Sequence, residues 1–103
     1  MAYYRMHDEK QSEQDFIADA SSWMWDFDDN GDLYERELPG VYSAFEDIDD
    51  LIRYYDGSND DQLVAIFDGE IVDRPHSDAR GEVLVAPSRL IGWATIRELM
   101  EDA

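Results

Sequence analysis

The sequence predicts an α+β fold in which two amphipathic helices precede a small, mainly antiparallel sheet and a short helix closes the chain. Three observations predict it. Apolar residues recur at helical spacing in two segments of the first half. Short β-branched runs follow in the second half, and an Asp-Gly pair separates two of them. The length of 103 residues corresponds to one domain, residues 1–103.

The first expected helix follows a short opening strand. Residues 2–7 are rich in aromatic side chains and fit a strand. Between Glu13 and Trp25, one apolar stripe recurs at helical spacing and consists of Phe16, Ile17, Ala20, Trp23 and Met24. A polar break over residues 26–31 ends this pattern.

The second expected helix begins after the Pro-Gly pair at positions 39 and 40. Its apolar residues step by four and three along one face and are Val41, Phe45, Ile48, Ile52 and Tyr55. The opposite face carries Glu46, Asp47, Asp49 and Asp50. Like charges at these spacings destabilise a helix by a few tenths of a kcal/mol per pair, so this face is not tuned for helix stability.

The second half has the shorter period of strands. Runs over residues 62–67 and 70–72 flank Asp68-Gly69, which predicts a hairpin with a type I′ turn. Residues 82–85 and 90–93 are expected to form two further strands, and residues 95–100 a closing helix.

The charge of the chain is strongly negative and uneven. There are 26 acidic residues against 8 basic ones, which gives a net charge of −18, and residues 26–62 hold 13 of the acidic residues and 2 of the basic ones. Such a surface repels phosphate, which argues against direct binding of nucleic acid or anionic membrane. A single lysine beside so much aspartate is also typical of a GC-rich genome or a salt-loving host.

Absent residue types narrow the class further. The chain has no cysteine, which excludes disulfides, a thiolate nucleophile and a zinc-thiolate site. Its start lacks the apolar stretch of a signal peptide, and no apolar run approaches the ~18 residues of a membrane span. We therefore expect a soluble, cytoplasmic protein with a packed core.

Residues 26–37 carry the sharpest local motif. Oxygen donors stand at positions 1, 3 and 5 of this segment, a glycine at position 6 and a glutamate at position 12. The segment resembles the calcium-binding loop of EF-hand proteins. The resemblance implies a calcium site formed by Asp26, Asp28, Asn30, Asp32 and Glu37. The alternative is a solvated acidic turn between helices.

A second pattern covers more of the chain. Arg5 and His7 lie on the expected opening strand, Tyr42 and Ser43 at the start of the second helix, and Glu82 on a strand. This order is similar to that of compact ADP-ribosyltransferases. The resemblance implies that Arg5 or His7, with Tyr42 or Ser43, holds a dinucleotide, and that Glu82 orients the acceptor. The alternative is ordinary packing of Tyr42 and an exposed Glu82.

The function favoured by the charge is that of a binding protein without catalytic residues. Its carboxylates would occupy the nucleic-acid site of a basic partner, so that the protein acts as a DNA mimic. In size, charge and lack of cysteine the chain is similar to the small acidic inhibitors that phages and mobile elements carry against restriction or CRISPR systems. The expected partner-binding residues are Asp28, Asp29, Asp32, Glu35, Glu46, Asp47, Asp49 and Asp50, with Trp25 and Tyr34 as aromatic anchors.

Overall fold

The computed structural model of the chain describes residues 1–55, 57, 59–74 and 81–101, without the side chains of Met24 and Trp25. Four strands form a closed antiparallel barrel in the order β1-β4-β6-β5, and two more form a separate hairpin, β2-β3. The elements in chain order are β1 (Ala2–His7), α1 (Glu13–Ala18), β2 (Ser21–Phe27), β3 (Leu33–Pro39), β4 (Tyr42–Phe45), α2 (Ile48–Tyr54), β5 (Leu63–Asp73), β6 (Glu82–Thr95) and α3 (Ile96–Glu101).

The two longest strands curve to close the barrel. β5 pairs with β1 as well as with β6, and β6 also pairs with β4. The β5–β6 register shifts at three places, and such bulges bend and twist a strand. At one of them the backbones approach closely, because a Cβ at position 69 would lie 2.3 Å from the carbonyl oxygen of Ala86. This approach therefore requires a residue without a side chain, and glycine at position 69 meets that requirement.

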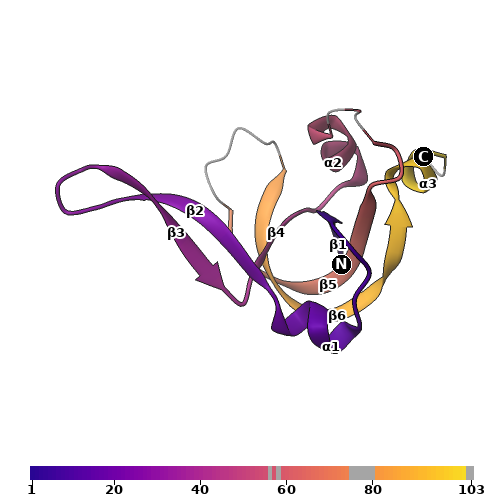
Figure 1. Ribbon diagram of the computed structural model, residues 1–103, viewed down its shortest axis with the longest axis horizontal. Coiled ribbons are helices and arrows are strands. Elements are labelled where there is room, and N and C mark those ends of the chain that lie inside the picture. Colours follow the sequence, from indigo (N-terminus) through magenta and orange to yellow (C-terminus); the bar gives the residue numbers. More distant parts are fainter. Residues whose placement is uncertain (56, 58, 75–80, 102–103) are drawn as a thin grey trace.

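The inside of the barrel is an aromatic core. Side chains alternate along a strand, so every second residue points inward. The buried inner cluster is formed by Tyr3, Phe16, Ala20, Tyr42, Ala44, Ala65, Phe67, Val83 and Val85. Phe16 comes from α1, which covers one end of the ring of strands (Figure 1). Its ring lies 4.6 Å from that of Tyr42 and 5.2 Å from that of Phe67, measured between centroids.

A second core lies outside the barrel, under α2 and α3. Its buried members are Phe45, Leu51, Val64, Ile96 and Leu99. The side chain of Asp47 caps the start of α2 by accepting a hydrogen bond of 2.9 Å from the backbone N–H of Asp49. No helix among the described residues is long and apolar enough to cross a membrane.

The β2–β3 hairpin, residues 21–39, extends away from the barrel and is called the arm below (Figure 1). It gives the molecule its elongated shape, with principal extents of 48 × 29 × 22 Å. At its base the backbone N–H of Gly40 donates to the carbonyl oxygen of Ala20 at 2.7 Å. Gly40 has a φ of 80°, a conformation that glycine adopts without strain, and the chain turns there into β4.

The predicted α+β fold with two leading helices is wrong, because the chain is mostly β, with 52% strand and 21% helix, and the three helices of its described part are short. The helix expected over 13–25 ends at Ala18, and residues 21–27 form β2. The helix expected over 41–55 is divided between β4 and α2. The opening strand and the closing helix are confirmed as β1 and α3.

The predicted hairpin turn at Asp68-Gly69 is also wrong. Both residues lie inside β5, which continues to Asp73, and neither has the positive φ that a type I′ turn requires. The strands expected over 82–85 and 90–93 are parts of one strand, β6. Pro87 lies between them and pairs with Gly69 at a register shift, where the regular hydrogen-bond ladder is interrupted.

Candidate functional site

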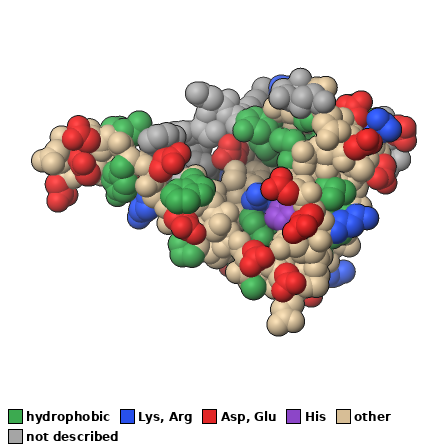
Figure 2. Space-filling view, viewed as in Figure 1, with side chains coloured by type: hydrophobic (Ala, Val, Ile, Leu, Met, Phe, Trp, Pro, Cys, Tyr) green, Lys and Arg blue, Asp and Glu red, His purple; other side chains and the backbone are tan. Residues whose placement is uncertain are grey.

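One face of the arm exposes large apolar side chains. Opposed residues of an antiparallel pair point to the same face, and the register pairs Trp23 with Glu37 and Phe27 with Leu33. The exposed fraction is 62% for Trp23, 67% for Phe27 and 56% for Leu33. Glu35 has the same strand parity as Leu33, so acidic and apolar side chains share this face. Figure 2 shows both kinds side by side along the arm.

The opposite face of the arm is more polar. Asp26 and Tyr34 are paired on it, and the Tyr34 side chain is 40% exposed. Arg36 lies next along this face, and its Nε is 3.5 Å from Oδ2 of Asp26. This contact neutralises one of the six carboxylates of the arm.

The tip of the arm, residues 28–32, is held by Asp28. Its Oδ1 accepts hydrogen bonds from the backbone N–H groups of Asn30 and Asp32, both at 2.9 Å. The backbone N–H of Asp28 in turn donates to the carbonyl oxygen of Asp32 at 3.0 Å. Gly31 has a φ of 79°, which closes the turn without strain. Asp28 therefore has a structural task in shaping the tip.

Four carboxylates of the arm remain without a cation. Within the described part of the chain, no ion pair joins Asp29, Asp32, Glu35 or Glu37 to a basic group. All four residues are exposed. The arm thus presents unneutralised charge next to exposed apolar surface.

The residues of the expected calcium loop do not converge on one point. The loop was expected between helices, whereas residues 26 and 27 continue β2 and residues 33–37 belong to β3. Glu37, which would close the site, opposes Trp23 and lies roughly 13 Å along the ladder from the Phe27–Leu33 pair. Asp26, Asp28, Asn30 and Asp32 lie near the tip. Among the described side chains, no group of three could hold a metal ion.

The acidic residues expected on the second helix form a separate group around α2, well apart from the arm (Figure 1). Asp47 caps the helix, and Glu46 forms an ion pair with Arg74. Asp50 lies 3.8 Å from Arg53. Asp49 is exposed without such a contact in the described structure. Most of this group is therefore committed to contacts within the chain.

Of the two expected aromatic anchors, the structure describes the side chain of Tyr34 but not that of Trp25. Tyr34 lies on the arm as described above. The side chain of Trp25 lies outside the described residues, and only its backbone pairing with Glu35 is given.

The residues of the transferase-like pattern are divided between the two faces of the barrel wall. Arg5, His7 and Tyr42 point inward; the guanidinium carbon of Arg5 lies 4.4 Å from the centroid of the Tyr42 ring. Ser43 and Glu82 point outward, and the Ser43 hydroxyl donates to Oε1 of Glu82 at 2.7 Å. The wall of the barrel thus separates Arg5, His7 and Tyr42 from Glu82, whereas Ser43 lies beside Glu82 on the outer face.

The arm residues that the sequence analysis did not select are Trp23, Phe27 and Leu33. A usable signal was present, since aromatic residues at positions 23, 25 and 27 alternate with residues 22, 24 and 26 at the period of a strand. The Asn30-Gly31 pair then marks a turn. Together they predict a hairpin with one aromatic face.

Comparison with known proteins adds no family to this geometry: no family model, curated protein or solved structure matches the chain.

Proposed function

We propose that this protein binds a basic, nucleic-acid-binding protein through the arm, and that the carboxylates of the arm occupy the site that nucleic acid would otherwise fill. The observation that carries the proposal is the combination, on one projecting hairpin, of three exposed apolar residues and four carboxylates that form no ion pair with a described residue. Exposed apolar patches of this kind mark interaction sites.

The stability of the arm supports the same reading. An isolated two-stranded hairpin is marginally stable in water, and among the described residues no further strand pairs with either outer edge of this one. Burying Trp23 and Phe27 against a partner would remove apolar surface from water, which stabilises the complex. The partner would cover the apolar face of the arm and could pair with its strand edges.

Charge density indicates how the partner would be held. The arm carries six acidic residues and one arginine over a ladder of about 23 Å, which is roughly one net charge per 5 Å. Duplex DNA carries one charge per ~1.7 Å of axis. The arm therefore cannot equal duplex DNA by charge alone. Its carboxylates would speed and orient the encounter, and its apolar face would supply the salt-resistant part of the affinity.

The test uses a partner that is captured on the immobilised protein, identified and purified. A labelled DNA oligonucleotide is bound to that partner, and displacement is followed by fluorescence anisotropy. The wild-type protein is expected to displace the DNA, less efficiently as salt rises. Simultaneous binding of DNA and of this protein to the partner would contradict the proposal.

Matched variants locate the contact. The charge variant combines Asp29→Asn, Asp32→Asn, Glu35→Gln and Glu37→Gln, and the apolar variant combines Trp23→Ser with Phe27→Ser. The control removes four exposed carboxylates elsewhere through Asp15→Asn, Asp49→Asn, Glu70→Gln and Glu101→Gln. Both arm variants are expected to lose displacement and the control to retain much of it, although its net charge equals that of the charge variant. Equal loss in the control and the charge variant would show that only total charge matters.

A further inference from the structure

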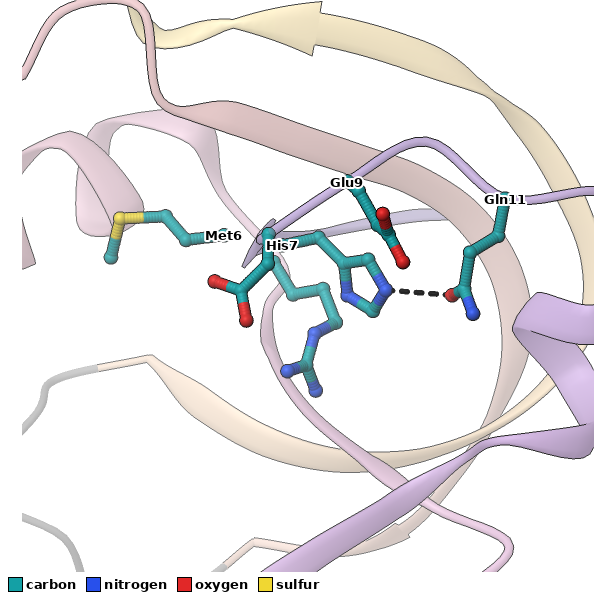
Figure 3. Close-up of a pocket in the computed structure, with 6 residues that line it drawn as sticks. Met6, His7, Glu9 and Gln11 are labelled. Carbon is teal, nitrogen blue, oxygen red and sulfur yellow. Dashed lines mark hydrogen bonds between the residues drawn. The ribbon is translucent and has the colours of Figure 1, made fainter.

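A cavity of about 190 Å³ opens at the end of β1. It is lined by the end of β1 and the residues that follow, namely Arg5, Met6, His7, Asp8, Glu9 and Gln11. Figure 3 shows the His7 ring facing the side chain of Gln11, with the Glu9 carboxylate beside them. The cavity thus brings together cationic, anionic and hydrogen-bonding groups within seven consecutive positions.

Arg5 is a largely buried cation that forms no ion pair among the described residues. Its Nε is buried with no hydrogen-bond partner in the described structure. Burial lowers the pKa of the guanidinium, against the opposing influences of Tyr42 and Asp8. A cation–π contact with the Tyr42 ring restrains the guanidinium, whose central carbon lies 4.4 Å from the ring centroid. A buried charge of this kind is stabilised when an anion reaches it.

The atoms that remain available on Arg5 are its two terminal nitrogens. Among the buried side-chain atoms of the described residues, Nε alone lacks a partner, so Nη1 and Nη2 keep accessible surface. Neither makes a hydrogen bond within the described structure. Two neighbouring N–H donors in one plane match the two oxygens of a carboxylate.

His7 is oriented by a chain of hydrogen bonds. Gln11 Nε2 donates to Oδ2 of Asp19 at 2.8 Å, which leaves Gln11 Oε1 to accept from Nε2 of His7, also at 2.8 Å. In the neutral ring the lone pair therefore lies on Nδ1. The rings of Phe16 and Trp93 surround the imidazole at centroid distances of 5.5 Å each. The orientation of the His7 ring, and the position of its acceptor Nδ1, are thus fixed in the protein without a ligand.

The signs of the charges select the class of ligand. A phosphate would bring two negative charges next to Asp8 and Glu9 in a chain whose net charge is −18. A zwitterion adds no net charge, and its cationic group would be attracted to the carboxylates of Asp8 and Glu9. We propose that the mouth of the barrel binds a free amino acid, with its carboxylate on Arg5 and its ammonium group facing Asp8 and Glu9. This proposal does not depend on the function proposed for the arm.

The test is NMR of the full-length, ¹⁵N-labelled protein with each of the 20 standard L-amino acids as the probe. At least one of them is expected to shift the Arg5 Nε–H resonance saturably, with a dissociation constant of about 1 mM or lower. Acetate, methylamine and inorganic phosphate are expected to bind at least about tenfold more weakly, since each lacks one of the two charges or carries the wrong one. A lack of saturation by every amino acid up to 10 mM, or equal binding of acetate, would overturn the proposal.

Two variants and a control separate the two ends of the ligand. Glu9→Gln, at an exposed position, is expected to weaken the amino acid and leave acetate unchanged or tighter. Arg5→Gln is expected to abolish both, with the fold checked by circular dichroism, whereas the exposed Arg89→Gln changes neither. Undiminished amino-acid binding in Glu9→Gln, or in a folded Arg5→Gln protein, would contradict the assignment. Glu9→Gln leaves the core intact and gives a result even if Arg5→Gln does not fold.

Discussion

The barrel and the arm differ in the solvent exposure of their large apolar side chains. Phe16 and Phe67 are fully buried in the barrel, whereas Trp23 and Phe27 on the arm are 62% and 67% exposed. Residues of the same chemical type thus stabilise one region and are left in water by the other. The aromatic residues of the arm are therefore not explained by burial within the folded chain, and their exposure is the observation on which the proposed contact with a partner rests.

The carboxylates show a parallel difference. Around the barrel, Asp68 lies 3.3 Å from the N-terminal amine, and Glu46 and Asp50 contact arginines. On the arm, Asp26 is joined to Arg36, while Asp29, Asp32, Glu35 and Glu37 have no cation in the described structure. The carboxylates named here differ in this way, but other exposed carboxylates outside the arm, such as Asp15 and Glu70, also form no ion pair in the described structure.

The largest expected effect comes from removing a ring on each side of this comparison. Phe16→Ala is expected to lower the free energy of unfolding by about 3–5 kcal/mol, because it empties the centre of the inner core. Trp23→Ala is expected to change it by less than about 0.5 kcal/mol, as for other exposed positions. Urea unfolding of both variants measures the difference. A large loss in Trp23→Ala would mean that the arm is packed against the barrel in solution.

A second pair of variants tests the close approach of β5 and β6. Gly69→Ala is expected to destabilise the protein by about 1–3 kcal/mol, because the new Cβ would overlap the Ala86 carbonyl. Gly92→Ala, also in a barrel strand, has open space around it and serves as the control. Thermal unfolding followed by circular dichroism distinguishes them. Equal melting temperatures would argue against the register at the bulge.

A third prediction concerns alkaline pH. Burial raises the pKa of Tyr42 above its ordinary value, although Arg5 opposes this. The neutral hydroxyl is therefore favoured by folding, so this stability is fully present below pH ~10 and is lost as pH rises through the folded-state pKa. Tyr42→Phe is expected to lose about 1 kcal/mol at pH 7 through the missing bond to the Phe16 carbonyl, and to show a shallower decline above pH 10. An unchanged profile in Tyr42→Phe would contradict the assignment.

The smallest expected effect is that of the charge variant of the arm on stability. Replacing Asp29, Asp32, Glu35 and Glu37 by their amides removes no ion pair within the described structure, so the free energy of unfolding should change by less than about 0.5 kcal/mol. Differential scanning calorimetry at low salt measures it. A loss above 1 kcal/mol would show that these carboxylates have partners within the folded chain.

Part of the core could be predicted from the sequence even where the secondary structure could not. Phe45, Ile48, Ile52 and Tyr55, placed on one helical face by their spacing, do pack in the outer cluster. However, Phe45 reaches it from a strand and not from a helix, because Tyr42 and Ala44 of the same strand point the other way, into the barrel. Short apolar runs fit both periods, and the choice depends on strand partners that are distant in the sequence.

The sequence predicted some of the acidic residues of the arm, but it could not separate them from the acidic residues near α2. Asp28, Asp29, Asp32 and Glu35 do lie together on the arm. The acidic residues near α2 were assigned to the same surface, because nothing local shows that Arg74 lies beside Glu46, 28 positions away. Long-range ion pairs are set by the fold, so the sequence alone did not divide the acidic residues into free and committed ones.

Amide hydrogen exchange, with and without the captured partner, tests the central claim most directly. In the free protein, the amides of β2 and β3 are expected to exchange far faster than those of β5 and β6, because a lone hairpin opens locally. On binding, protection should rise in the arm and remain unchanged in the barrel. Protection that rises over α2 or the barrel strands, with an unchanged arm, would contradict the assignment of the arm as the partner-binding element.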